Sequence, residues 1–246
     1  MAGETAKREA ICLDIRPWSR TSHIVTWLTP TGKVVTSVKG ANRPKSPFLG
    51  QYDLNYACEI VYYLRARGEI HALRECSPLR TREHLRSNCR ALILAGYLRS
   101  LTAELAPQGP DCGSWHRTLE QALERLQTAT GRQSLLALML GFELDLLGLA
   151  GIRPNFSGVD RNAEWSPFSL ERGAFLKASE EARGRIIRVA PEVAKYLEKP
   201  DEAEKNLQIP LDAARVIGVF YTFHLDCAPD VRRSVLGLIS QNEAER

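Results

Sequence analysis

The sequence predicts an α+β protein with more than one domain, in which a small five-stranded β-barrel of the OB type precedes an all-helical domain. Two observations predict this fold. The first 76 residues contain five strand-like runs joined by short turns, and the apolar residues change to a helical period after Ser77 and Pro78. A chain of 246 residues is long enough to bury its own core. We expect the barrel over residues 1–80 and the helical domain over residues 81–246.

The five strands are marked by alternating apolar residues or by β-branched runs. They are expected at 10–18, 22–29, 33–40, 52–64 and 69–76. The second and third are joined by Pro30, Thr31 and Gly32, a hairpin connection in which the glycine can supply a positive φ. Strands this closely spaced fit a closed barrel, because closure removes the exposed edges of a sheet.

The helices are marked by apolar residues at helical spacing. They are expected at 81–105, from an N-cap at Ser114, and at 134–149, 191–199, 211–225 and 230–239. The segment 134–149 is apolar nearly all round, which predicts the buried centre of a bundle. Gly151 and Pro154 end it. Residues 155–178 form an irregular insert with two strand-like hints.

Charge is distributed unevenly along a chain whose net charge is only +4. Residues 1–80 hold twelve lysines and arginines against seven acids, so the whole basic excess lies in the predicted barrel. From Ile15 to Tyr52 the chain carries six cations and no acid. A field of one sign attracts a polyanion, which favours nucleic acid as a ligand.

The strongest candidate contacts are Lys39, Arg43 and Lys45, with the hydroxyl of Ser46, at the end of one strand and in the following loop. The alternative is a solvated loop kept soluble by its charges. Further candidate DNA-binding residues are Lys33, Arg65, Arg67, Arg74, Arg82, Arg86 and Arg90, with Arg16 and Arg20 as weaker ones. Arg82, Arg86 and Arg90 recur every four residues and would line one helix face, although such a stripe is usually solvated. Candidate base-stacking aromatics are Trp18, Trp27 and Tyr52.

Three segments together resemble the RecO family of DNA-repair and recombination-mediator proteins. They are the hairpin at 21–41 with its basic loop, the segment EIHALRE at 69–75, and FELDLLGLAGIRPNF at 142–156. The resemblance covers the whole chain. It implies a non-enzymatic, cytoplasmic and nucleoid-associated protein that binds single- and double-stranded DNA and anneals complementary strands. It also implies that, with RecR, the protein helps to load RecA onto strands coated by single-strand-binding protein.

The resemblance has one departure. Many RecO-like chains hold a four-cysteine zinc site after the proline that ends this helix, whereas residues 157–179 contain neither cysteine nor histidine. We therefore expect no structural zinc and no cofactor, with Trp165, Phe168 and Phe175 forming an apolar cluster instead. The six cysteines are scattered and are expected to be reduced. His224 and Cys227 are one helical turn apart, but two ligands do not make a zinc site.

Other classes of function find less support. The chain has no P-loop, GxGxxG, GxSxG or HExxH motif. It has neither an apolar run of roughly 18 residues nor a secretory signal. The alternatives are an RNA-binding OB-fold accessory factor, a protein–protein adapter without nucleic-acid binding and, least favoured, a hydrolase.

A receptor for the acidic tail of single-strand-binding protein needs an apolar pocket rimmed by cations, and the residues considered for it are Leu123, Leu126 and Arg132.

Overall fold

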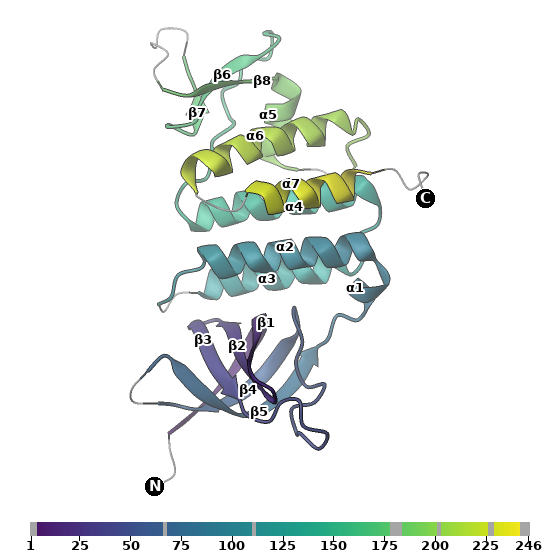
Figure 1. Cartoon of the computed structure of the whole chain (residues 1–246). Coiled ribbons are helices and arrows are strands. Elements are labelled where there is room, and N and C mark those ends of the chain that lie inside the picture. The colour runs from purple at the N-terminus through teal and green to yellow at the C-terminus, as the bar shows by residue number, and fades with distance from the viewer. Residues whose placement is uncertain are drawn as a thin grey trace. The chain divides into compact units, whose positions relative to one another are not determined.

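The computed structural model describes residues 4–65, 68–109, 112–177, 184–200, 203–225 and 229–241 (Figure 1). The chain forms two compact units. The first comprises Met1–Cys89 with Arg99–Gln127, and the second comprises Arg90–Leu98 with Thr128–Arg246.

The first unit contains a closed five-stranded barrel (Figure 1). Its strands are β1 (Thr5–Ser19), β2 (Ser22–Thr29), β3 (Gly32–Val38), β4 (Ala57–Tyr63) and β5 (Ile70–Arg80). The order around the barrel is β1-β2-β3-β5-β4, with β1 pairing both β2 and β4. The β3–β5 pair is parallel, whereas its neighbours are antiparallel. This arrangement confirms the predicted OB-type barrel.

Several strands differ in extent from the prediction, since β1 begins at Thr5 instead of residue 10 and β3 ends at Val38 instead of residue 40. The expected strand at 52–64 begins only at Ala57, because Asn55 has a φ of 67° and Tyr56 N–H donates to the Asp53 carbonyl in a turn. The last strand runs past Pro78 to Arg80, since Pro78 stays in register opposite Cys58 of β4.

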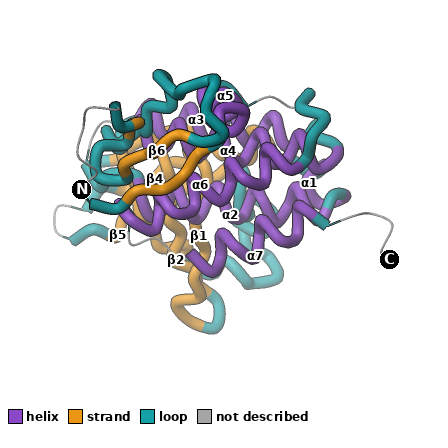
Figure 2. Tube along the Cα trace, turned by 90° about the horizontal axis from the view of Figure 1, so that it is seen from above, coloured by secondary structure: helices purple, strands orange, loops and turns teal. Residues whose placement is uncertain are grey.

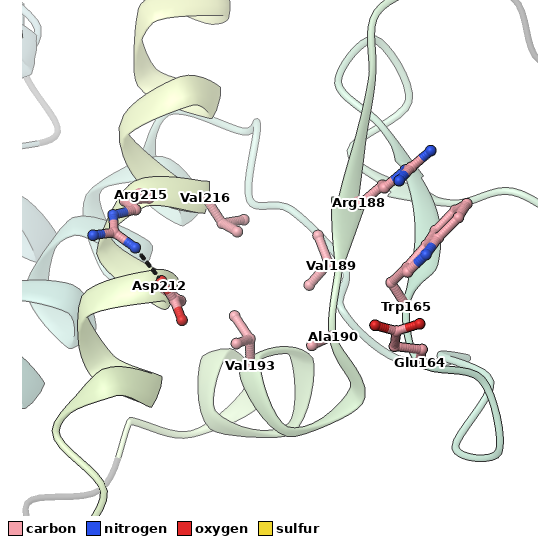
Figure 3. A pocket seen from close by; sticks show the side chains of 9 residues that line it. All are labelled: Glu164, Trp165, Arg188, Val189, Ala190, Val193, Asp212, Arg215 and Val216. Atoms are coloured by element: carbon pink, nitrogen blue, oxygen red, sulfur yellow. Dashed lines mark hydrogen bonds and ion pairs between the residues drawn. The ribbon is translucent and has the colours of Figure 1, made fainter.

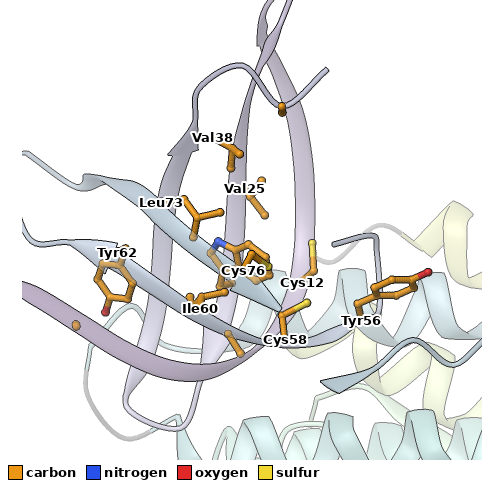
Figure 4. Packing of buried hydrophobic residues seen from close by; sticks show 13 residues of the cluster. Cys12, Val25, Val38, Tyr56, Cys58, Ile60, Tyr62, Leu73 and Cys76 are labelled. Carbon is orange, nitrogen blue, oxygen red and sulfur yellow. The ribbon is translucent and has the colours of Figure 1, made fainter. Parts of the chain in front are cut away.

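The barrel interior is built from apolar side chains and three thiols. Val25, Trp27 and Ile60 are fully buried. Three cysteines from three strands project into the same interior (Figure 4): Cys12, Cys58 and Cys76. The Cys58 and Cys76 thiols both donate to the Gln51 carbonyl, at 3.6 Å each. Burial raises the pKa of the Cys12 thiol, and the hydrogen bond with Cys58 together with burial raises the pKa of Cys76. Cys12 and Cys76 therefore act as small protonated core residues.

The helix expected at 81–105 is interrupted. A short α1 (His84–Ser87) is followed by α2 (Cys89–Leu105), and Asn88 between them has extended backbone angles. The next helix, α3 (Gly113–Leu126), has its N-cap at Cys112, so the prediction of Ser114 as the cap was wrong by two residues. In the first unit, the turn between β2 and β3 lies against the segment before α3. A Cβ added at Gly32 would meet the Gly109 carbonyl at 3.2 Å.

The second unit is built around α4 (Gly131–Leu149), which is buried along most of its length as predicted. It packs against α6 (Gln208–His224) and α7 (Pro229–Ser240), and α6 also contacts α5 (Pro191–Glu198) (Figure 2). A small sheet holds β6 (Ser166–Ser169) between β7 (Ala174–Phe175) and β8 (Ile186–Val189). The strand-like hints in the sequence correspond to β6 and β7, whereas β8 was not predicted. Among the described residues, no helix is long and apolar enough to cross a membrane.

Helix α4 carries a buried ion pair at its centre. Glu143 is fully buried and accepts two hydrogen bonds from the Arg232 guanidinium of α7, at 2.8 Å each. The Tyr97 hydroxyl donates to the same carboxylate at 2.6 Å, and the Tyr221 hydroxyl donates to the Glu143 carbonyl at 3.0 Å. The neighbouring Asp145 is exposed. Glu143, in contrast, is a buried charge in a helix that the sequence predicts to be apolar nearly all round.

Helix α3 carries a buried histidine that predicts a pH dependence of stability. Burial lowers the pKa of His116, although the charges of Glu120 and Glu9 oppose the shift. The unfolded chain then binds this proton at a higher pH than the folded chain does. The stabilisation is present above the ordinary histidine pKa of about 6.5 and is lost as the pH falls below it.

We expect His116→Phe to reduce the loss of unfolding free energy between about pH 7.5 and pH 5.5, a range that spans the ordinary histidine pKa. Urea unfolding at several pH values measures this, with His84→Gln as an exposed-histidine control. Equal pH dependence in wild type and His116→Phe would contradict the prediction.

Candidate nucleic-acid interface

The segment that follows β3 carries three exposed cations. We call residues 39–46 the basic loop, and its exposed cations are Lys39, Arg43 and Lys45. Two turns shape the loop, since the Arg43 N–H donates to the Gly40 carbonyl at 3.1 Å and the Ser46 N–H donates to the Arg43 carbonyl at 2.9 Å. Gly40 has a φ of 69°, which glycine adopts without strain. The turns therefore keep the three cations within one short segment.

The basic loop is fastened to the turn between β1 and β2. The Asn42 N–H donates to the Thr21 carbonyl at 3.2 Å, and the Gly40 N–H donates to the Ser22 hydroxyl at 3.3 Å. The Asn42 side-chain amide lies 3.1 Å from Nε2 of His23 on β2. These contacts place the exposed Arg20, which lies in that turn, beside the basic loop.

A second tie runs through His23. Its Nδ1 lies 2.8 Å from the Tyr52 hydroxyl. Since the Asn42 amide nitrogen can only donate, Nε2 of a neutral ring accepts and Nδ1 donates to Tyr52. Burial, followed by the charges of buried thiols, raises the pKa of Tyr52, so its hydroxyl remains protonated. His23 was not among the predicted site residues, and no local sequence signal links it to residues 19 and 29 positions away.

The charges of the basic loop are not neutralised locally. Among the residues that the structure describes, Lys39, Arg43 and Lys45 form no ion pair. Ser46 is half-buried, and its hydroxyl oxygen accepts the Phe48 N–H at 3.2 Å, which leaves its O–H as a donor. This cluster therefore offers point charges, one guanidinium fork and one hydroxyl, the groups that bind phosphate oxygens.

Lys33 lies at the other end of the β2–β3 hairpin. The strand separates it from Lys39 by about 20 Å, at the usual rise per residue. Its ammonium group donates to the Ala103 carbonyl of α2 at 2.9 Å. Burial lowers the pKa of Lys33, although the charge of Cys112 opposes the shift. The structure therefore does not bring Lys33 together with the basic loop.

The connection between β4 and β5 contributes less free charge than expected. Arg65 is exposed, and its backbone N–H donates to Nδ1 of His71 at 3.2 Å. Arg67 lies outside the described residues. The Arg74 guanidinium forms an ion pair with Glu75 at 3.0 Å and lies over the Tyr63 ring. An adjacent acid thus offsets the charge of Arg74.

The expected arginine stripe does not form a single helix face. Arg82 precedes α1, has a φ of 53° and a side chain only 1% exposed. It pairs with Glu120 at 2.5 Å and with Glu124 at 3.1 Å, both on α3. A buried and doubly paired guanidinium is not accessible to a phosphate, so the prediction of Arg82 as a DNA contact conflicts with the geometry.

The other two arginines of the stripe lie on different helices. Arg86 of α1 is exposed but pairs with Asp53 at 2.7 Å. Arg90 belongs to α2 and the second unit, where it donates to the Gln241 carbonyl at 3.0 Å. The break at Asn88 removes the four-residue period on which the stripe depended.

The structure separates the three candidate stacking aromatics. Trp27 is fully buried, and its indole N–H donates to the Thr36 hydroxyl at 2.8 Å. Tyr52 is half-buried beside it. Trp18, at the end of β1, is 69% exposed. Trp18 is therefore the one of the three with a ring available to a base.

Comparison with protein families identifies both parts of the chain. A model described as Recombination protein O N terminal matches residues 1–82, and a model described as Recombination protein O C terminal matches residues 86–230. The chain belongs to the RecO family. Membership of the RecO family confirms the resemblance inferred from the sequence and supports a role as a mediator of DNA recombination and repair. RecO-family mediators generally act without catalysis. No curated protein matches the chain.

The insert of this RecO-family chain is organised by aromatic side chains. Phe168 is fully buried, stacks on Phe156 with ring centroids 5.0 Å apart, and meets the Phe175 ring edge to face. The expected cluster is therefore confirmed for Phe168 and Phe175. Trp165 is 39% exposed and instead lies under the Arg188 guanidinium at 4.2 Å. Within the described ranges, no three His, Cys, Asp or Glu side chains are grouped to hold a metal ion. Cys227, the partner considered for His224, lies outside those ranges.

The residues considered as a receptor for an acidic tail do not form one. Leu123 and Leu126 are buried in the first unit, and Arg132 donates to the Ser240 carbonyl in the second. The second unit does hold a pocket of about 380 Å³ between β8, α5 and α6, shown in Figure 3. Three valines, Ala190 and Trp165 form its apolar lining. Two arginines and two acids lie around it: Arg188, Arg215, Glu164 and Asp212. The number of acidic side chains around the pocket equals the number of cationic ones, so the pocket has no net charge to attract an acidic tail.

Proposed function

We propose that this RecO-family protein binds DNA through the basic loop of its barrel and anneals complementary strands without ATP. We further propose that it acts with RecR to load RecA onto single strands coated by single-strand-binding protein, at the nucleoid. The family assignment supports the general role. The RecR, RecA and single-strand-binding-protein partnerships follow from the family resemblance alone.

One observation carries the proposed DNA site: three exposed cations lie on one loop with no ion-pair partner among the described residues, and hydrogen bonds hold that loop to the next turn of the barrel. Cations without acid partners gain more from a phosphate than paired cations do, because no existing ion pair must be broken. Neutralising phosphates on two strands lowers their mutual repulsion, so base pairing proceeds faster.

The first test compares binding over a salt series. Binding of a labelled single-stranded oligonucleotide is measured by fluorescence anisotropy. We expect a triple variant, Lys39→Ala, Arg43→Ala, Lys45→Ala, to have a flatter slope of log affinity against log salt concentration. The slope should change by about 2, since each phosphate contact contributes about 0.7. The same variant should slow the annealing of complementary strands.

A matched control removes three charges that are already paired. Lys7, Arg153 and Arg233 form ion pairs with Glu59, Asp145 and Asp230. Their triple alanine variant has the same net charge as the basic-loop variant and should keep the wild-type slope. Equal slopes for both variants would show that net charge alone governs binding. Tighter binding of RNA than of DNA of the same length would favour the RNA-binding alternative, because discrimination must come through the 2′-OH.

A further inference from the structure

The end of β1 contains an irregularity that turns a large aromatic side chain outward. The pairing with β2 runs in register from Asp14 to Pro17, which lies opposite His23, and then shifts so that Ser19 lies opposite Ser22. One residue, Trp18, is therefore extra on β1 and forms a β-bulge. Bulges at barrel rims commonly redirect a side chain next to a binding site.

Trp18 is the most exposed of the large apolar side chains in the described residues. Its side chain is 69% exposed, whereas Trp27 and Trp115 are buried and Trp165 is partly covered by Arg188. A bulky apolar ring in water lowers solubility without adding to the core. An indole that is exposed at a bulge is consistent with a ring that a ligand covers.

The surroundings of Trp18 identify the chemistry of that ligand. Two residues beyond it lies Arg20, and the same turn receives the hydrogen bonds of Asn42 and Gly40 from the basic loop. The aromatic ring thus lies at the part of the barrel that carries exposed, unneutralised cations. A π-face beside cations is the arrangement that binds unpaired bases together with their backbone.

We propose that Trp18 is a stacking platform for an unpaired base, so that the barrel distinguishes single-stranded from duplex DNA. This inference rests on the proposed function, in which the basic loop holds the phosphates. The cations contact phosphates of either form of DNA. Trp18 gains a partner only where a base is free of its duplex stack, because paired bases bury both faces in the helix.

The test is the affinity of the full-length protein for an oligothymidylate and for a duplex of equal length, measured by anisotropy at one salt concentration. Trp18→Ala should weaken single-strand binding by about 5- to 150-fold, the range for loss of one stacked base. Duplex affinity should stay within about twofold, since backbone contacts carry it. Trp18→Phe should keep most of the single-strand affinity, whereas Trp18→Leu should lose it, because only phenylalanine has a π-face.

Leu49 is 60% exposed and lies, like the basic loop, in the connection between β3 and β4. It supplies the control for a purely apolar contact. Leu49→Ala should leave both affinities unchanged. In a Trp165→Phe background, which removes the other partly exposed indole, oligothymidylate should quench the tryptophan fluorescence. This quenching should disappear when Trp18→Phe is added.

The outcomes separate this inference from the proposed function. Unchanged single-strand affinity in Trp18→Ala, with the basic-loop variant still losing its salt dependence, would overturn the stacking role and leave the DNA site standing. Equal losses for single strands and duplex would also overturn it, because Trp18 would then act on the backbone or on the fold. If neither variant lost affinity for single strands or for duplex, both proposals would be overturned.

Discussion

Glu143→Leu is expected to lower the free energy of unfolding by about 3–5 kcal/mol, the usual result of removing one partner from a buried ion pair. The substitution leaves the Arg232 guanidinium, with a side chain only 10% exposed, facing an apolar group. It also leaves the Tyr97 hydroxyl without the carboxylate that it now contacts. Urea unfolding followed by circular dichroism measures the loss.

The matched control lies two residues further along α4. Asp145 pairs with Arg153 at 3.0 Å in solvent, so Asp145→Ala should cost less than about 1 kcal/mol. Replacing Glu143 and Arg232 together by leucine and methionine, with Tyr97→Phe, should recover most of the loss, because no charge or hydroxyl is then left unpartnered. A triple variant no more stable than Glu143→Leu would show that packing, and not the uncompensated charge, explains the effect.

Arg82→Ala is expected to lower the free energy of unfolding by about 3 kcal/mol, near the lower end of the range for a broken buried pair. The substitution removes the buried guanidinium that pairs with Glu120 and Glu124 of α3. Only the more exposed Arg80 then remains near these acids, 2.5 Å from Glu120 and 4.0 Å from Glu124. It also removes the donor to the buried Asn55 carbonyl. The salt dependence of DNA binding should not change, because this guanidinium is inaccessible.

The backbone at Arg82 allows a sharper version of the experiment. Its φ of 53° is left-handed, a conformation that costs an L-residue about 1 kcal/mol or more but costs glycine little. Arg82→Gly should therefore be less destabilising than Arg82→Ala by about 1 kcal/mol. Arg86→Ala, at an exposed pair four residues further along, serves as the control and should cost under about 1 kcal/mol. Arg82→Ala within that same limit would refute the assignment of Arg82 to the core of the first unit.

The barrel could be predicted from the sequence because its signals are local. Alternation along 10–18 and the turn at Gly32 depend on residues next to one another, and both correspond to observed strands and hairpin. The buried centre at α4 was equally visible, since its residues are apolar nearly all round. The errors fall where a short polar residue decides the backbone. Asn55 delays β4 and Asn88 divides the first helix, and neither position stands out from its neighbours in the sequence.

The candidate site divides in the same way. The sequence by itself determined that the basic loop is rich in cations and poor in acids, because that is a property of a continuous segment. Only the tertiary structure decided that Lys33, Arg82 and Arg86 have partners, since those partners are distant in the chain. Ala103 accepts from Lys33, Glu120 and Glu124 enclose Arg82, and Asp53 pairs with Arg86.

For the aromatic and acidic residues too, the sequence shows where they lie in the chain, and the tertiary structure decides which are buried. Three candidate rings looked alike in sequence, and closure of the barrel buried Trp27 while a bulge exposed Trp18. In the sequence, nothing near Glu143 distinguishes it from a surface acid. In the structure, Arg232, from a helix near the other end of the chain, lies 2.8 Å from it. Local composition determined where charge and aromatic rings are abundant. Tertiary packing decided which of them are accessible to a ligand, because burial and ion pairing depend on contacts that the order of residues does not reveal.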